Sequence, residues 1–132
     1  DVAEGTEATR HEVLDVAKGV EVYEIDGPFF FGVATKFEEL MRTTIGSKPV
    51  VRIIRMRKVP FIDATGVHNL EMLISSSLKD GIKVVLSGVK PEVQDVLDHA
   101  GIDRLIGAEN ICSHITIAVR KANKMAMQEM EA

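Results

Sequence analysis

The residues best suited to chemistry lie in the stretch Val59 to Leu70, VPFIDATGVHNL, where an apolar run meets a helical pattern. Asp63 falls at the expected helix start, so its carboxylate can accept hydrogen bonds from first-turn amides that lack partners within the helix. A phosphate on the Thr65 hydroxyl would be stabilised by the same amides and by the helix dipole. Gly66 is expected to keep the backbone accessible. The turn therefore fits a helix cap or a phosphate-sensitive binding site, and our candidate site is Asp63, Ala64, Thr65 and Gly66.

Other chemistry-bearing residues form no convincing set. Cys112 and His114 lie two apart, but two ligands without a third make a poor metal site, and we expect a buried thiol beside an exposed imidazole. Ser75 to Ser77 sit inside a helical pattern, where they indicate a small-residue face with a solvated edge. The remaining histidines are dispersed: His11, His68 and His99. Neither G-x-G-x-x-G nor the P-loop pattern occurs. We therefore expect no catalytic, metal-binding or cofactor-binding residues and no enzyme activity.

Composition limits the possible classes of protein. A chain of 132 residues fits one domain, which we expect to span residues 11–132 after a flexible polar lead-in at residues 1–10. The net charge is −4 and the basic residues are scattered, which argues against nucleic-acid binding. A single cysteine favours a reducing compartment. No apolar run approaches the roughly 18 residues that cross a bilayer, so no span is expected in this segment.

Periodicity predicts strands that alternate with helices. The fold class indicated is α/β, with a mainly parallel sheet and right-handed crossovers. A turn at Gly27-Pro28 is expected to make the sheet mixed, and periodicity leaves open whether the helices cover one face or both. The expected strands are 11–16, 19–25, 50–56, 82–87 and a short edge piece at 111–112. The expected helices are 33–41, 65–79, one from Pro91 to Gly101, and a last one capped by Ser113.

Two further segments allow two interpretations each. The tail from Arg120 to Ala132 carries Met125, Met127 and Met130, which fit either a fraying helix end or an adaptable surface that packs on a membrane domain or partner helix. The phenylalanine run at 29–31 is either wholly buried or partly exposed, since successive strand residues face opposite sides.

Taken in order, these segments resemble a STAS domain, the module named for sulfate transporters and anti-sigma factor antagonists. The resemblance runs from about Val20 to Lys124 and rests on VVRIIRM, PFIDATGVHNL, IKVVLSG, PEVQDVLDHAG and ITIAVRKA. The text VYEIDGPFFFGVA at 22–34 is similar to the C-terminal cytoplasmic STAS domain of sulfate permease (SulP) family anion transporters. The resemblance implies a STAS (SpoIIAA-like) fold: a central mixed, mostly parallel sheet of four or five strands packed with four or five helices.

The resemblance also implies a role in binding and regulation rather than catalysis. In the antagonist branch the turn resembles Asp-Ser-Ser/Thr-Gly, and a partner kinase phosphorylates the first serine. Here Ala64 stands at that position and has no hydroxyl, so only Asp63, Thr65 and Gly66 carry over. Thr65 remains a possible acceptor at the neighbouring position. A partner-switching cycle through this turn is therefore in doubt, and the turn is expected chiefly to contact partners.

The function expected from the resemblance is that of a regulatory, non-catalytic domain of a sulfate permease family anion transporter. Its expected partners are the transmembrane domain of the same polypeptide, a sister protomer or a cytosolic regulatory protein, with no cofactor and no nucleic acid. The expected location is the cytoplasmic face of the inner (plasma) membrane, as a segment of a longer polypeptide whose membrane part precedes Asp1. One alternative is a free-standing anti-sigma factor antagonist-like signalling protein, and another, motivated only by the anion-friendly helix start, is a small hydrolase or nucleotide-binding enzyme.

Overall fold

The computed structural model describes residues 16–26 and 48–131. Within them a parallel sheet of three strands has the order β1-β2-β3. The strands are β1 (Val20–Asp26), β2 (Val51–Lys58) and β3 (Lys83–Ser87). Ile111 extends the sheet by one parallel bridge to Leu86, which confirms strand-like pairing at the short edge piece. The described strands therefore match the parallel part of the predicted α/β fold.

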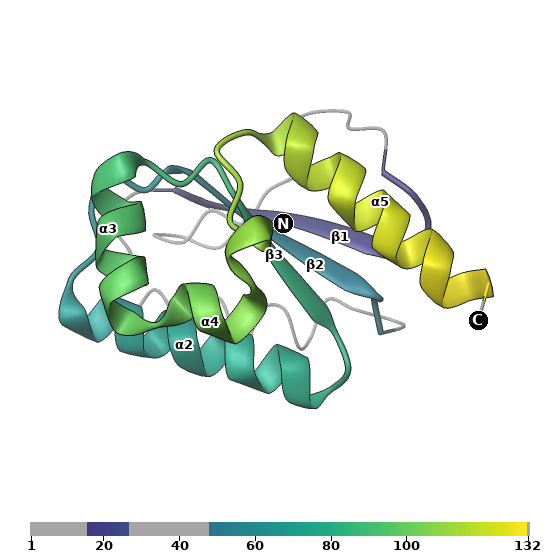
Figure 1. Cartoon of the computed structure of the whole chain (residues 1–132), viewed down its shortest axis with the longest axis horizontal. Coiled ribbons are helices and arrows are strands. Elements are labelled where there is room, and N and C mark those ends of the chain that lie inside the picture. Colours follow the sequence, from purple (N-terminus) through teal and green to yellow (C-terminus); the bar gives the residue numbers. More distant parts are fainter. Residues whose placement is uncertain (1–15, 27–47, 132) are drawn as a thin grey trace.

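Helices cover both faces of this sheet, as Figure 1 shows. The helical elements are α2 (Ala64–Lys79), α3 (Pro91–Ala100), α4 (Ile102–Ile106), the 3-10 turn η1 (Ala108–Asn110) and α5 (Ile115–Glu131). Helices α2, α3 and α4 pack on one side, and α5 lies across the other. Periodicity left open whether the helices cover one face of the sheet or both, and the structure shows that they cover both.

The alternating side chains of the strands build two cores. Ile54 and Met56 of β2 point toward α2 and α3, whereas Val51 and Ile53 point toward α5. All four are fully buried, as expected for a central strand that is covered on both faces. At roughly 1.5–3 kcal/mol for each fully buried aliphatic side chain, this strand is the main hydrophobic anchor of the domain.

The predicted boundaries agree with the structure to within one or two residues. Helix α2 begins at Ala64, one residue earlier than expected, and α5 begins at Ile115, two residues after the predicted cap Ser113. Residues 102–106 form the short helix α4, because Gly101 adopts a left-handed φ of 84° that ends α3 and lets α4 start at once. Several expected features lie outside the described residues: the lead-in at 1–10, most of the strand at 11–16, the turn at 27–28, the phenylalanines at 29–31 and the helix at 33–41.

One glycine is required by close packing between strand ends. Gly88 follows β3 with φ 67°, and a Cβ atom there would lie 2.9 Å from both the Cα and the backbone nitrogen of Arg57. Gly81 also has a positive φ, 81°, but a Cβ atom there would meet only the Lys48 Nζ at 3.8 Å. Both positions require a positive φ, but only at Gly88 would a Cβ atom collide with the backbone.

We expect Gly88→Ala to destabilise the protein more than Gly81→Ala does. Both substitutions cost about 1 kcal/mol for placing alanine at positive φ, and only the first also forces the ends of β2 and β3 apart. Chemical denaturation of the two variants measures the difference. Equal losses in the free energy of unfolding would contradict a packing role for Gly88.

Candidate functional site

The candidate turn is built by the chain leaving β2 and entering α2. Asp63 is in an extended conformation at the N-cap, and its Oδ1 accepts a hydrogen bond from the Gly66 amide at 2.7 Å. Its backbone carbonyl accepts from the Val67 amide at 2.9 Å, which starts the helical ladder. The predicted capping role of Asp63 is therefore confirmed.

The four candidate residues differ in exposure. Asp63, Ala64 and Thr65 are exposed, whereas Gly66 is buried. The expectation that Gly66 keeps the backbone accessible is therefore wrong, because its amide is occupied by the cap and its Cα faces the interior. The carbonyl of Thr65 accepts a hydrogen bond from the Asn69 side chain at 2.8 Å. The surface that the turn offers consists of the Asp63, Ala64 and Thr65 side chains.

Exposed apolar side chains stand beside this turn. Phe61 precedes it and is 52% exposed, and Met72, two helical turns beyond Thr65, is 54% exposed. His68 lies between them on the helix and is exposed as well. Contiguous exposed apolar patches, rather than single exposed residues, mark contact sites. This face of α2 therefore exposes apolar side chains near the polar residues of the turn.

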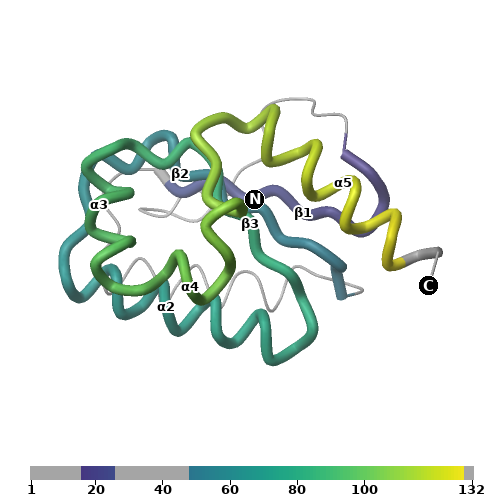
Figure 2. The backbone as a smooth tube through the Cα atoms, in the orientation of Figure 1, coloured from purple at the N-terminus to yellow at the C-terminus, as the bar shows by residue number. Residues whose placement is uncertain are grey.

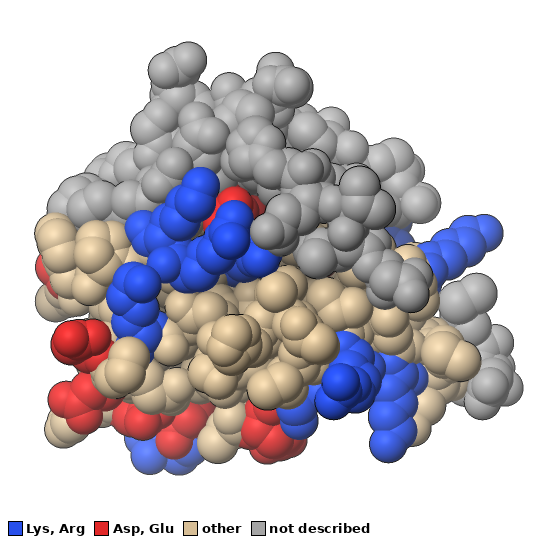
Figure 3. Space-filling model, turned by 90° about the horizontal axis from the view of Figure 1, so that it is seen from above, with Lys and Arg blue, Asp and Glu red and all other residues tan. Residues whose placement is uncertain are grey.

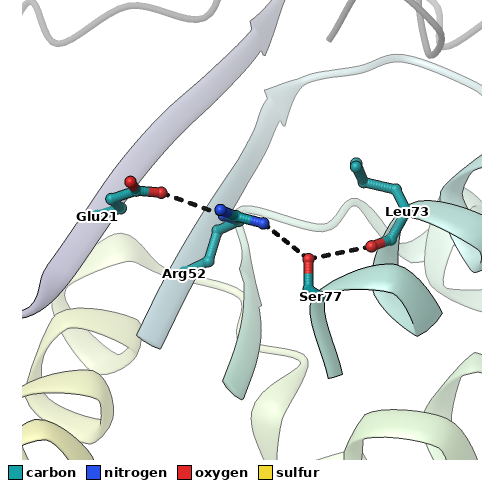
Figure 4. A network of polar contacts seen from close by, with 4 residues as sticks. All are labelled: Glu21, Arg52, Leu73 and Ser77. Carbon is teal, nitrogen blue, oxygen red and sulfur yellow. Dashed lines mark hydrogen bonds and ion pairs between the residues drawn. The ribbon is translucent and has the colours of Figure 1, made fainter. Parts of the chain in front are cut away.

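A buried polar network fixes the other end of α2, as Figure 4 shows. The Arg52 guanidinium donates from Nε to Glu21 Oε1 at 3.1 Å and from Nη1 to Ser77 Oγ at 2.8 Å. Ser77 donates in turn to the carbonyl of Leu73 at 3.0 Å. The side chains of Arg52 and Glu21 are only 8% and 10% exposed. The network therefore joins β1, β2 and α2 through charged side chains that are buried from solvent.

Sequence reasoning missed this network. Ser77 was expected on a small-residue face with a solvated edge, yet it is buried at 2% exposure and hydrogen-bonded. Glu21 and Glu24 occupy the polar positions of a strand whose residues alternate between apolar and polar, which predicts exposure, yet both are buried. The available signal was Arg52 inside VVRIIRM, because a charge in the middle of a strand apolar on both faces needs a buried partner.

A second ion pair lies toward the carboxyl ends of the same strands. Arg57 donates from Nε to Glu24 Oε2, and the Glu24 side chain is 3% exposed against 40% for Arg57. Ser87, at the end of β3, is fully buried, and its hydroxyl has no hydrogen-bond partner in the part of the chain that the structure describes. Nothing in this arrangement assembles a nucleophile with a base and an oxyanion donor.

The remaining sequence candidates stay apart from one another. Cys112 is buried and His114 is exposed, as predicted. Burial raises the pKa of the Cys112 thiol, and the nearby Lys121 ammonium offsets part of that rise. Among residues 16–26 and 48–131, no three His, Cys, Asp or Glu side chains gather as a metal ion would require. Over the same residues, no helix combines the length and the apolar character needed to cross a bilayer.

The comparison with known families decides what kind of domain this is. The family model for the STAS domain matches residues 13–118. The chain belongs to the STAS domain family. Its STAS fold, predicted from the sequence, is thereby confirmed.

Two solved structures resemble this STAS domain over nearly its whole length. One is a sulfate transporter family protein from Wolinella succinogenes, 41% identical, with a TM-score of 0.79 over 85% of this chain and 91% of that chain. The other is the SulP transporter STAS domain from Vibrio cholerae, 38% identical, with a TM-score of 0.74 over 88% of this chain and 87% of that chain. The predicted likeness to the transporter branch is confirmed.

A curated relative is much longer than this domain. YvdB of Bacillus subtilis (strain 168), a candidate sulfate transporter, is 26% identical over 117 residues. The match covers 83% of this chain but 22% of that protein. This STAS domain thus spans about a fifth of the length of the curated relative it matches.

We expect Asp63→Ala to lower the free energy of unfolding by about 1 kcal/mol, because the Gly66 amide loses its acceptor. Asp63→Ser is the matched control, since a serine hydroxyl also caps helices and should keep most of the stability. Urea denaturation of the two variants makes the test. If alanine proved as stable as serine, the cap would contribute nothing measurable.

We expect Arg52→Met to cost about 3–5 kcal/mol, because it removes the guanidinium that pairs with the buried Glu21 carboxylate. The double variant Glu21→Gln with Arg52→Met removes both charges and should recover much of that loss. Thermal and urea melts of the single and double variants measure the coupling. A double variant no more stable than the single one would show that the pair does not act as a unit.

Proposed function

We propose that this chain is the regulatory STAS domain of a SulP family anion transporter and that it works by protein contact rather than by catalysis. The observation that carries the proposal is the match to transporter STAS domains at 41% and 38% identity over almost the entire chain. The alignment with only 22% of a candidate sulfate transporter supports a domain that works as one module of a longer protein.

The partners proposed are the transmembrane domain of the same polypeptide, a sister protomer or a cytosolic regulatory protein. The exposed Ala64 and Thr65 provide the contact, flanked by the apolar Phe61 and Met72. A rigidly capped helix start presents these side chains in one geometry, which lowers the ordering cost of binding. The location that follows is the cytoplasmic face of the inner (plasma) membrane.

The size and compartment of the natural protein test the attachment. We expect an antibody against this domain to detect, in fractionated cells, a membrane-bound band several times larger than 14.5 kDa. A band near 14.5 kDa outside the membrane fraction would contradict the proposal and favour the free-standing antagonist-like alternative. In that case phosphate on Thr65 would become the feature to seek, because Ala64 offers no hydroxyl.

The contact role of the turn has its own test. In the full-length transporter, Ala64→Arg should reduce anion uptake, with sulfate assayed first, while the amount of protein in the membrane stays unchanged. Ala100→Arg is the matched control, because Ala100 is also an exposed helical alanine but lies at the end of α3. A bulky cation at the turn blocks a docked partner, whereas the control site has no proposed contact. Equal uptake by the two variants would remove the turn from the docking surface.

A further inference from the structure

Helix α5 presents an outward stripe that combines two basic and two apolar side chains. Ile117 and Met127 are exposed by 39% and 56%, and Arg120 and Lys124 between them are exposed too. At 3.6 residues per turn these four positions fall within an arc of roughly 80° on the side of the helix away from the sheet. The buried side of the same helix is formed by Ala118, Ala122 and Ala126. We call the four outward residues the α5 stripe.

Further positive charge borders the α5 stripe on both sides. Lys121, partly buried, follows Arg120 on the helix. On the other side the exposed Lys18 adjoins Ala17, whose amide donates to Asn123 Oδ1 of α5 at 2.8 Å. Figure 2 shows the start of β1 running beside α5. The α5 stripe therefore lies in the middle of a wider basic surface.

Acidic residues are missing from this part of the helix. Residues 113–128 contain no aspartate or glutamate, and Glu129 forms an ion pair with Lys83 at 3.8 Å. The chain as a whole carries a net charge of −4, so this stretch of α5 has the opposite sign to the protein as a whole. Figure 3, seen from above, shows Lys and Arg side chains in separate groups among uncharged residues, with Asp and Glu side chains gathered along the lower left edge.

We propose that the α5 stripe binds an anionic lipid surface through its basic side chains, with Ile117 and Met127 entering the headgroup region. The two apolar residues lie ten positions apart, about 15 Å along a straight helix, which suits a flat surface. Groups of basic side chains are attracted to anionic bilayers, and exposed apolar side chains beside them can enter the headgroup region. We favour a bilayer over an acidic protein partner because both apolar side chains lie on the outward side of α5, where one flat surface can reach them together.

The two faces of the domain then have different tasks. Helix α2, with the candidate turn, packs on the opposite side of the sheet from α5 (Figure 1). Lipid contact through α5 directs that turn away from the bilayer, so among the proposed partners of the turn it favours a sister protomer or a cytosolic protein over the transmembrane domain. The lipid proposal concerns this chain alone, so it can fail or succeed independently of attachment to a transporter.

Flotation with vesicles of phosphatidylcholine alone, or with 30% phosphatidylserine, tests the proposal on the 132-residue chain. We expect binding to the anionic vesicles at 50 mM salt, little binding to neutral ones, and release at 500 mM salt as charge attraction is screened. Arg120→Gln with Lys124→Gln should lower the partition coefficient about 25-fold, since each basic residue near an anionic surface contributes about fivefold. Ile117→Gln with Met127→Gln should weaken binding and its resistance to salt.

Lys79→Gln with Arg104→Gln is the matched control, because both residues are exposed and belong to α2 and α4 on the other face. This pair should change partitioning less than threefold, and circular dichroism verifies that every variant is folded. Equal losses in the two charge pairs would overturn the assignment to α5. No binding of the folded wild-type chain to anionic vesicles would overturn lipid recognition and leave the stripe to a protein partner or to water.

Discussion

The pairing of Arg52 with Glu21 is the constraint on which the arrangement of this domain depends. The two residues stand opposite each other in the parallel register of β1 and β2, and the same guanidinium reaches Ser77 of α2. Slipping β1 by one residue would turn its side chains to the other face and leave a buried charge without a partner. A slip between strands that carried only aliphatic side chains would cost less free energy. The Arg52–Glu21 pair therefore favours one strand register, and the bond to Ser77 favours one position of α2.

The position of α2 on the sheet in turn determines which of its side chains are exposed. Ser77 holds the last turn of the helix against the sheet, and the Asp63 cap fixes its first turn. Between these points Leu70 and Ile74 are fully buried, so the helix has little freedom to rotate about its axis. The exposed Ala64, Thr65 and Met72 are thereby held in one geometry, which is what a docking surface needs and what a flexible loop would not provide.

The strands and helices could be predicted from the sequence, because apolar residues recur every two residues in a half-buried strand and every three or four in a helix. The cap at Asp63 was also predictable, since capping is a local interaction between neighbours in the chain. The burial of Glu21 and Ser77 was not, because it depends on Arg52, which lies 31 and 25 positions away along the chain. The buried state of Gly66 escaped for a similar reason: its environment comes from the core beneath α2 rather than from its own turn.

The placement of α5 affects how the chain can be made. This helix packs on the face of the sheet that carries Val51, Ile53 and Val85, and it follows the other described elements in the chain. Its tie to Ala17 closes a separation of 106 residues. During translation the strands are therefore made before the helix that packs on this face. Until α5 is in place, these apolar side chains lack its cover, and transiently exposed apolar surface is prone to associate with other chains.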